Sequence, residues 1–549
     1  MTSRLPLLLT VVVAGACASG GTQPTAPPQQ PPAVVTPPVV SPPTPPPPRP
    51  SEAAANWQLL DPIADRFPGI SLERAQRELL AGKQPKRTVV VAVIDGGVDT
   101  AHADLRANLW RNPKETAGNA RDDDNNGLVD DVYGWNFIGG RDGRNVQWDT
   151  FEVTRLYSLC QKRAPEAASL PCEKITADYQ KRKGEAEQTL GQINMIAPAF
   201  DQAVRLLKQT LGTDSPTIAK VQAMRAPNGG VEQAKAIYLQ LASNGVTEEV
   251  ITEAREQFTT QLQYNLDPNF NPRPIVGDNY ADLTERRYGN RDVTGPDAKH
   301  GTHVAGIIGA VRGNNVGIDG VATSVRIMAV RAVPDGDERD KDIANAIRYA
   351  VDQGANIINM SFGKAWSPAK PAVDDAAKYA DSKGVLIVHA AGNDSEDLST
   401  NPSYPVAKTA DGTRVARWIE VGASSWKGAD TIAAAFSNYG REQVDVFAPG
   451  EDILSTVPGG GTSRQSGTSM AAPVVSGLAA LIMAYYPELN AQEVKDIILQ
   501  STTKLGDRTT LRPGEDSAKV AFGTLSATGG IVNAFNALRA AEQAVAAKR

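Results

Sequence analysis

An unbroken β-branched run constrains the fold of this chain more than any other feature. Residues 88–94 read Thr-Val-Val-Val-Ala-Val-Ile and lead into Asp95, which is followed by two glycines. A strand with one wet face alternates apolar and polar residues, whereas a parallel strand buried on both faces is apolar throughout. Open α/β sheets carry their functional side chains at the carboxyl ends of such strands. The run therefore predicts a parallel sheet with Asp95 at its functional edge.

A second block surrounds Ser469. Residues 466–473 read Ser-Gly-Thr-Ser-Met-Ala-Ala-Pro and open an apolar run that continues to Tyr485. Pro473 suits the first turn of a helix, and Pro487 lies just beyond its end. A serine at a helix N-terminus lies beside free N–H groups and the positive end of the helix dipole, which suit a developing oxyanion. A plain Ser/Gly helix cap has the same local pattern, so a functional reading needs other segments.

Those segments supply an acid and a base, because a serine becomes a good nucleophile only beside a base. His300 stands in the first turn of a predicted helix that reads His-Gly-Thr-His-Val-Ala-Gly. The three blocks, in this order, closely resemble the Asp, His and Ser blocks of the subtilisin (subtilase) family of serine endopeptidases. The resemblance spans residues 88–545 and implies that Asp95 orients the base, His300 is the base and Ser469 is the nucleophile. It also implies that the side chain of Asn393 completes an oxyanion hole.

The resemblance implies a polypeptide-binding site with two walls. On one wall, the family lays its substrate as an added antiparallel strand, and the matching residues here are Ser361, Phe362 and Gly363. The residues that match the opposite wall are Ala390, Ala391 and Gly392. Phe362 and His389 are expected to shape the primary pocket between them.

Strands and helices alternate between the His and Ser blocks. We expect strands at 326–333, 356–360 and 385–389, helices at 342–353 and 369–383, and a last helix at 531–546. This repetition predicts a doubly wound parallel sheet, here of the subtilisin type with a helical insertion.

The insertion covers residues 150–265. Apolar residues spaced by three and four along 190–211 predict an amphipathic helix, kinked at Pro198, and further helices are expected at 231–243 and 247–263. We expect a packed body that limits access to the active site, although it can also pack away from the cleft. Cys160 and Cys172 lie in this insertion and can form a disulfide in an exported protein.

An acidic loop follows the Asp block. Oxygen atoms in the spacing of a calcium loop are offered by Asp122, Asp124, Asn126 and the carbonyl of Leu128, with Asp130 or Asp131 closing the shell. The twelfth position is valine, so the loop is not an EF-hand. We expect a structural calcium ion here; the alternative is a solvated acidic turn.

The N-terminal residues predict export and anchoring. Residues 1–16 have the short apolar segment of a signal peptide, and Ala14-Gly15-Ala16-Cys17 resembles a bacterial lipobox that places a lipid on Cys17. The alternative is a plain cleavage site beside an incidental cysteine. Residues 17–50 then form a proline-rich linker and residues 51–87 a short N-terminal segment. We expect a lipid-anchored protein of the bacterial cell envelope, at the outer membrane or cell surface.

Composition excludes several other classes of function. The net charge is −6 and the basic residues are scattered, so no nucleic-acid-binding stripe is present. Three cysteines and four histidines show no zinc spacing. The leading hypothesis is an exported, monomeric, membrane-anchored serine endopeptidase. The alternatives are a catalytically silent binding lipoprotein, or an amidase or esterase, on the same fold.

Overall fold

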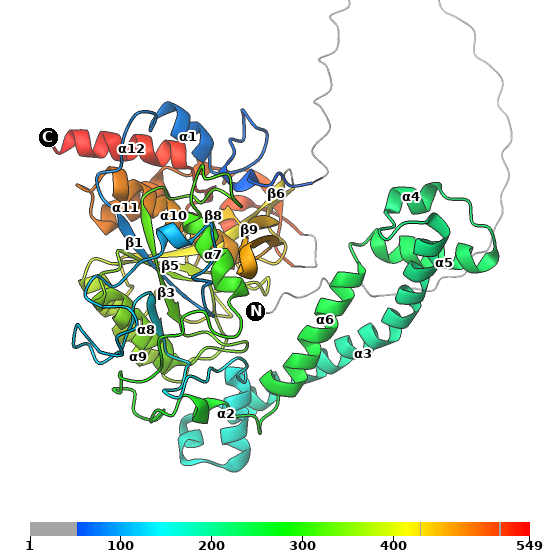
Figure 1. Ribbon diagram of the computed structural model, residues 1–549, viewed down its shortest axis with the longest axis horizontal. Coiled ribbons are helices and arrows are strands. Elements are labelled where there is room, and N and C mark those ends of the chain that lie inside the picture. Colours follow the sequence, from blue (N-terminus) through cyan, green and yellow to red (C-terminus); the bar gives the residue numbers. More distant parts are fainter. Residues whose placement is uncertain (1–51, 429, 515–517) are drawn as a thin grey trace, which may run out of the picture.

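The computed structural model describes residues 52–428, 430–514 and 518–549, so residues 1–16, Cys17 and the linker at 17–50 lie outside the described residues. A ten-stranded, mostly parallel sheet forms the centre, in the order β11-β14-β8-β6-β5-β4-β1-β3-β2 with β7 beside β6 (Figure 1). Its strands are β1 (Val89–Asp95), β2 (Gly134–Asn136), β3 (Val325–Arg331), β4 (Ile357–Met360), β5 (Leu386–Ala390), β6 (Trp418–Gly428), β7 (Thr431–Ala433), β8 (Val446–Pro449), β11 (Thr503–Lys504) and β14 (Gly530–Ile531). Two hairpins pair β9 (Ile453–Val457) with β10 (Gly461–Gln465) and β12 (Thr509–Leu511) with β13 (Lys519–Ala521).

Strand β1 lies between β3 and β4 and is parallel to both. Its side chains alternate between the two faces, so Val91 and Val93 enter one core and Ala92 and Ile94 enter the other. The predicted strand buried on both faces is therefore confirmed. The helices packed on the first face are α1 (Leu72–Glu78), α7 (Lys299–Gly309), α10 (Thr468–Tyr485), α11 (Ala491–Gln500) and α12 (Ala534–Ala547), and those on the second face are α8 (Asp340–Asp352) and α9 (Lys370–Ser382).

The strands and helices predicted between the His and Ser blocks are confirmed, with ends that differ by at most two residues. The last helix starts later than expected, because Ile531 pairs in β14 and the helix begins at Ala534. Helix α10 runs through the centre and all its residues are buried. Among the described residues it is the one helix that is long and apolar enough to cross a membrane.

Residues 52–87 pack against the body formed by the central sheet and its helices. Trp57, Leu59, Ile70 and Leu72 are buried in the same core as β1 and α10. The indole Nε1 of Trp57 donates to the carbonyl of Glu451 at 3.0 Å. The segment therefore shares one core with the sheet.

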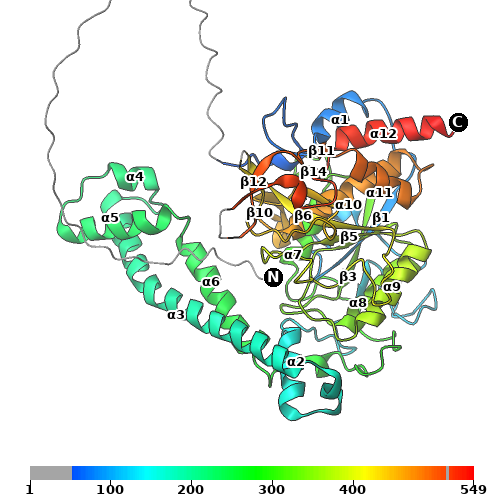
Figure 2. The same cartoon turned by 180° about the vertical axis from the view of Figure 1, so that it is seen from behind.

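The insertion forms a long arm that projects from the body (Figures 1 and 2). Its helices are α2 (Glu152–Lys162), α3 (Cys172–Leu211), α4 (Ile218–Ala223), α5 (Gly229–Ala242) and α6 (Glu248–Thr260), followed by a π-helical turn at Gln261–Asn265. A proximal core surrounds Tyr179 and Leu266, and a distal core surrounds Phe200 and Tyr238. Helix α3 continues through Pro198 as one element of 40 residues and begins at Cys172, well before the predicted stretch of 190–211.

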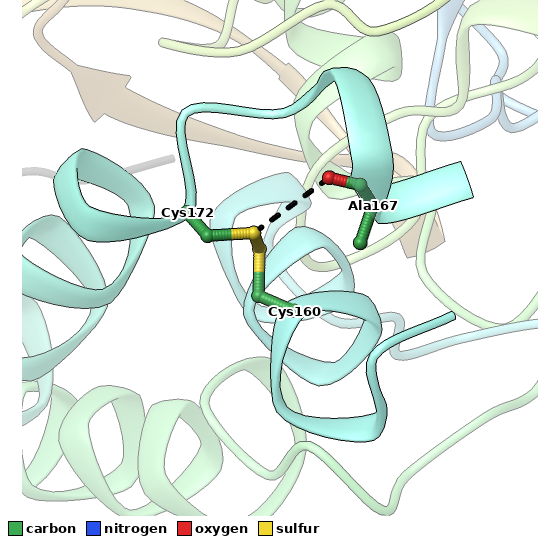
Figure 3. Close-up of a disulfide and its surroundings, with 3 residues drawn as sticks. All are labelled: Cys160, Ala167 and Cys172. Carbon is green, nitrogen blue, oxygen red and sulfur yellow. Dashed lines mark hydrogen bonds between the residues drawn. A yellow bond between two sulfur atoms is a disulfide. The ribbon is translucent and has the colours of Figure 1, made fainter. Parts of the chain in front are cut away.

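The insertion was expected to be one packed body, but its apolar residues form two separate cores, and the distal half of the arm stands apart from the sheet in both views. The base of the arm does pack against the body. There a disulfide joins Cys160, near the end of α2, to Cys172, the first residue of α3, with the Cα atoms 5.7 Å apart (Figure 3). Within the disulfide, Cys172 Sγ also contacts the carbonyl of Ala167 at 3.9 Å.

Candidate active site

Asp95 and His300 are joined by a hydrogen bond at the edge of the sheet. Asp95 ends β1, and His300 is the second residue of α7. His300 Nδ1 lies 2.8 Å from Oδ1 and 2.9 Å from Oδ2 of Asp95. The carboxylate is an acceptor, so Nδ1 carries the hydrogen and Nε2 carries the lone pair. Within the described residues Nε2 is buried and has no hydrogen-bond partner. The imidazole is thus oriented as a base with a free acceptor.

This close approach depends on a glycine. A Cβ atom on Gly301 would lie 2.2 Å from the carbonyl oxygen of Gly97 and 3.0 Å from Cβ of Asp95. Any side chain at this position would separate α7 from the end of β1. The glycine after His300 therefore serves the geometry of the acid–base pair.

Ser469 lies in the first turn of α10, which packs against α7. Its hydroxyl Oγ donates to the carbonyl of Ser361 at 3.1 Å, and Ser361 Oγ donates to the carbonyl of Ser469 at 3.0 Å. The described structure has no hydrogen bond between Ser469 Oγ and His300. The fold therefore brings Ser469 to the predicted substrate segment, Ser361–Gly363, with its hydroxyl bonded to the carbonyl of Ser361.

Asn393 is oriented by the residue before the nucleophile. Its Oδ1 accepts hydrogen bonds from the backbone N–H of Thr468 at 2.8 Å and from Thr468 Oγ1 at 3.0 Å. These two donors assign the oxygen end of the amide, so the Nδ2 end is free to donate elsewhere. Thr468 Oγ1 also accepts from the N–H of Gly392 at 3.1 Å. Gly392 has φ of +103° and leaves no room for a Cβ atom, which would lie 2.3 Å from Nδ2 of Asn438.

The predicted substrate segment follows β4 and has one open stretch. Lys364 is already paired with Tyr404, because each N–H donates to the other carbonyl, at 3.0 and 2.8 Å. Gly363, one residue earlier, makes no backbone hydrogen bond in the described structure. A Cβ atom on Gly363 would lie 2.5 Å from Ser403 Oγ. The free backbone of Gly363 beside the nucleophile is what an added antiparallel strand requires.

The opposite wall is fixed by neighbouring strands. Ala390 ends β5, and the N–H of Ala391 donates to the carbonyl of Val421 at 3.0 Å. The carbonyl of Ala391 accepts from Nδ2 of Asn438 at 2.9 Å. These bonds fix the segment Ala390–Gly392, which directly precedes Asn393.

Several of the predicted calcium ligands in the acidic loop bind the loop's own backbone. Asp122 caps the N–H groups of Asn126 and Gly127, and Asn126 Oδ1 accepts from the N–H of Leu128. The carboxylate of Asp130 is bound by Arg291 and by two backbone N–H groups. The predicted calcium ligand set of Asp122, Asp124, Asn126, Leu128 and Asp130 or Asp131 stays a prediction, and in the structure the side chains of Asp122, Asn126 and Asp130 hold the loop's own backbone.

Asp124 and Asp131 instead converge with Glu115. One carboxylate oxygen from each lies within 4.8 Å of the others, and Glu115 Oε2 is buried without a partner. Burial raises the pKa of Asp131 to about 6, although Tyr349 donates to it. These oxygen donors suit a hard cation such as calcium. Glu115 was missed because it lies outside the loop, and no spacing in the sequence ties it to Asp124.

The other histidine of the catalytic helix is structural. His303 Nε2 lies 3.0 Å from the carbonyls of Ile453 and Ser463. Burial lowers the pKa of His303 to about 4, so the ring is neutral at pH 7. These contacts make His303 a packed structural residue.

Comparisons with known proteins agree with this site. The model of the subtilase family matches residues 86–514. The thermophilic serine proteinase of Bacillus sp. (strain AK1) is 39% identical over 240 residues, which are 43% of this chain and 53% of that protein. Subtilisin NAT of Bacillus subtilis subsp. natto is 37% identical over 214 residues, which are 38% of this chain and 52% of that protein. The chain thus spans about half the length of these curated relatives.

A solved protease structure from Pseudoalteromonas arctica is 20% identical and covers 88% of this chain and 97% of its own, with a TM-score of 0.46. The matched family region contains the strand that ends in Asp95, the helix of His300 and the helix of Ser469. The chain belongs to the subtilase family.

Proposed function

We propose that this protein is a serine endopeptidase that cleaves polypeptides through an acyl-enzyme on Ser469. The observation that carries the proposal is the Asp95–His300 pair, whose Nε2 is buried and unpartnered beside the helix of the nucleophile. An acid-oriented imidazole with a free acceptor is what a serine nucleophile needs. A silent binding protein has no requirement for this arrangement.

The first chemical step begins with a rotation of the Ser469 side chain. The hydroxyl leaves the Ser361 carbonyl and donates to His300 Nε2. Oγ then attacks the substrate carbonyl carbon while its proton passes to Nε2. The developing oxyanion accepts from Asn393 Nδ2 and from the backbone N–H of Ser469. When the C–N bond breaks, the amine leaves with the proton from Nε2, and water later repeats the sequence to release the acid.

Polypeptides are favoured as substrates because the Gly363 backbone is unpaired beside the nucleophile. An ester or a simple amide needs no such edge. The test is incubation of the protein with an unbiased peptide library, with product masses read out and Ser469→Ala as control. Hydrolysis of small esters or amides without cleavage of any peptide would instead support the esterase or amidase alternative.

We also propose that the protein is exported and anchored by a lipid on Cys17. The support comes from the apolar segment within residues 1–16, the lipobox-like residues before Cys17 and the proline-rich linker to residue 50. Expression in a bacterial host should give membrane-associated protein with the mass of a lipidated N-terminus. Cys17→Ser should release it into the soluble fraction. Equal membrane association of both forms would contradict the anchor.

Calcium binding by Glu115, Asp124 and Asp131 is the third proposal. Binding to the folded state alone stabilises by RT ln(1 + [L]/Kd), about 2.7 kcal/mol at a hundredfold excess over Kd. A chelator should therefore lower the melting temperature of the wild type, and Asp124→Asn should remove most of this sensitivity. Asp123→Asn is the matched control, since the Asp123 side chain accepts from Thr116 and Asn119, and its backbone N–H, which donates to Glu115, is the same in both forms. An unchanged melting temperature with chelator would favour the solvated acidic turn.

A further inference from the structure

A buried histidine–glutamate pair lies directly behind the substrate segment. His389, on β5, is 0% exposed, and Glu420, on β6, is 4% exposed. His389 Nδ1 lies 2.8 Å from Glu420 Oε1, and His389 Nε2 lies 2.8 Å from the carbonyl oxygen of Phe362. Trp418 Nε1 donates to the other oxygen of Glu420 at 2.8 Å. The pair thus connects β5 and β6 to the substrate segment.

The hydrogen-bond partners of His389 determine where its ring protons lie. The carbonyl of Phe362 only accepts, so His389 Nε2 must carry a hydrogen. A neutral ring of that tautomer would point the lone pair of Nδ1 at a carboxylate oxygen. A second proton must therefore lie between Nδ1 and Oε1, either as imidazolium and carboxylate or as imidazole and carboxylic acid. Asp445 is a charged residue beside this pair. Its Oδ2 accepts from the Glu420 N–H at 2.8 Å, and its carboxylate forms an ion pair with Arg414.

The bond to Phe362 fills a gap in the support of the substrate segment. In an extended strand the backbone groups of successive residues point to alternate sides. Ser361 accepts from the nucleophile and Gly363 is unpaired, whereas the carbonyl of Phe362 points inward to His389. The pairing with Tyr404 begins only at Lys364. At the position of Phe362, the described structure therefore offers the imidazole as the donor to this carbonyl.

We infer that His389, held by Glu420, is a positioning residue that fixes the backbone of Ser361–Gly363 so that a bound polypeptide lies in register with Ser469. This inference rests on the proposed peptidase function and extends it to a pair that touches neither the substrate nor the reacting atoms. Loss of the donor would leave the half-buried Phe362 carbonyl unpaired, and the segment would tilt to satisfy it.

Two reactions of the same serine separate this role from the triad. Cleavage of an extended peptide needs the substrate segment, whereas labelling of Ser469 by a small sulfonyl fluoride needs the triad but no added strand. His389→Leu should lower kcat/KM for the peptide by roughly tenfold to a hundredfold, mainly through KM, the range expected for an unpaired buried carbonyl. Its rate of sulfonyl labelling should stay close to that of the wild type. His389→Gln, whose amide can donate to the same carbonyl, should recover part of the loss.

The matched control is His102→Gln, which alters another buried histidine that contacts a backbone carbonyl, that of Gly461 at 3.2 Å. It should leave the peptide KM unchanged. Peptide cleavage by His389→Leu equal to wild type, or an equal fall in both reactions, would overturn the inference. If the wild type neither reacted with the sulfonyl fluoride nor cleaved any peptide, the proposed function itself would fail.

A measurement on the wild type keeps the test decisive if His389→Leu does not fold. The chain has four histidines, which makes nitrogen NMR of ¹⁵N-histidine protein tractable. The His389 ring should carry a hydrogen on Nε2 and share a second one at Nδ1, and Glu420→Gln should abolish that shared hydrogen. A His389 ring without a hydrogen on Nε2 could not donate to Phe362, and the inference would be wrong.

Discussion

At the scale of single residues, the side chains of His300 and Asn393 are each oriented by a hydrogen bond at the end opposite to their free nitrogen atom. Nδ1 of His300 is held by Asp95, which directs Nε2, and Oδ1 of Asn393 is held by Thr468, which directs Nδ2. The hydroxyl of Ser469 is held on Ser361, away from the base. The base and the oxyanion donor are therefore preorganised, and the nucleophile is the group that has to move.

Removal of the nucleophile should abolish activity without unfolding the protein. Ser469→Ala is expected to lower kcat by about 10⁶, a cost known for subtilisin, a member of this family, rather than a value derived for this chain. Asn393→Ala should be milder, roughly 10² to 10³, again by analogy with subtilisin, because this side chain stabilises charge and makes no bond. Peptide cleavage by purified variants with wild-type circular dichroism checks both. Turnover by Ser469→Ala near the wild-type rate would exclude this serine as the nucleophile.

The sequence was sufficient for the reactive residues and insufficient for their partners. Asp95, His300, Asn393 and Ser469 each lie in a short block that is recognisable by itself. Glu420, by contrast, is apart from His389 by 31 positions and meets it only because β5 and β6 are neighbours. Glu115 was missed for the same reason. Contacts that depend on which strands or loops become neighbours cannot be inferred from local spacing.

At the scale of elements, the base of the arm is bound to the residue that follows the substrate segment. The Nζ atom of Lys364 lies 2.9 Å from Glu152 on α2 and 2.8 Å from Asp340 on α8. Nearby, Nε1 of Trp366 donates to Asp178 on α3 at 2.8 Å. Lys364 and Glu152 are almost fully buried, so breaking their bond would leave an uncompensated charge in the interior.

Glu152→Gln should therefore destabilise the protein at neutral pH. Burial raises the pKa of Glu152, but the charges of Arg155 and Lys364 outweigh it and hold the pKa well below its usual range. A carboxyl with a depressed pKa stabilises the folded state above its unfolded pKa of about 4.3, and the contribution is lost as the pH falls below it. The expected loss is about 3 kcal/mol at pH 7, at the lower end for a broken buried pair because Asp340 remains.

Urea unfolding of wild type and Glu152→Gln at several pH values measures this difference. It should be constant between pH 6 and 8 and should shrink progressively as the pH is lowered below about 4. Lys83→Gln, which removes an exposed pair with Glu542, is the matched control and should change little. A difference that is independent of pH would contradict the ionic origin of the effect.

The disulfide is expected to stabilise the same base. It closes a loop between residues 12 positions apart and ties the end of α2 to the start of α3. Such a crosslink contributes about 3 kcal/mol on the chain-entropy model. Exported protein should show the Cys160–Cys172 crosslink in non-reducing peptide maps, and Cys172→Ser should raise hydrogen exchange in α2 more than in β1. Two free thiols in exported protein would contradict the prediction.

The first half of α3 shows why the arm was only partly predictable. Residues 172–189 carry charged pairs four residues apart, such as Arg182 with Asp178, and have few apolar side chains. A helix stabilised by surface pairs lacks the apolar stripe on which the prediction relied. The stripe begins where the distal core begins, so only that half of α3 was recognised.

At the scale of the whole molecule, the protein consists of one catalytic body and one arm with its own distal core. The proximal core and the Lys364–Glu152 bond belong to the base of the arm. Removal of the distal part alone should therefore leave the substrate segment supported.

Shortening the arm tests whether it selects substrates. Residues 190–254 are replaced by a short Gly/Ser linker, which keeps the disulfide, Asp178 and Arg182. Cleavage of a small chromogenic peptide is expected to stay near the wild-type rate, whereas cleavage of a folded protein should increase, because the projecting arm restricts the approach of a bulky substrate. Met195→Gln, which changes an exposed side chain on the intact arm, is the control. If both rates change by the same factor, the arm does not select by size.

The hydrogen bonds that join the two chain segments at the base of the arm also affect how the chain folds. Nδ2 of Asn265 donates to the carbonyl of Asp149, 116 positions away, and the N–H of Phe151 donates to the carbonyl of Asn265. Bringing the ends of a flexible loop of that length together costs about 4 kcal/mol of chain entropy. The arm can offset this cost locally, because α3 and α6 contact each other within it. Val89 on β1 and Val325 on β3 are paired but far apart in sequence. When the arm is already folded, the pairing of these strands closes a much shorter effective loop. We therefore expect the arm to speed the assembly of the sheet, so that a chain whose arm cannot form its helices would refold more slowly.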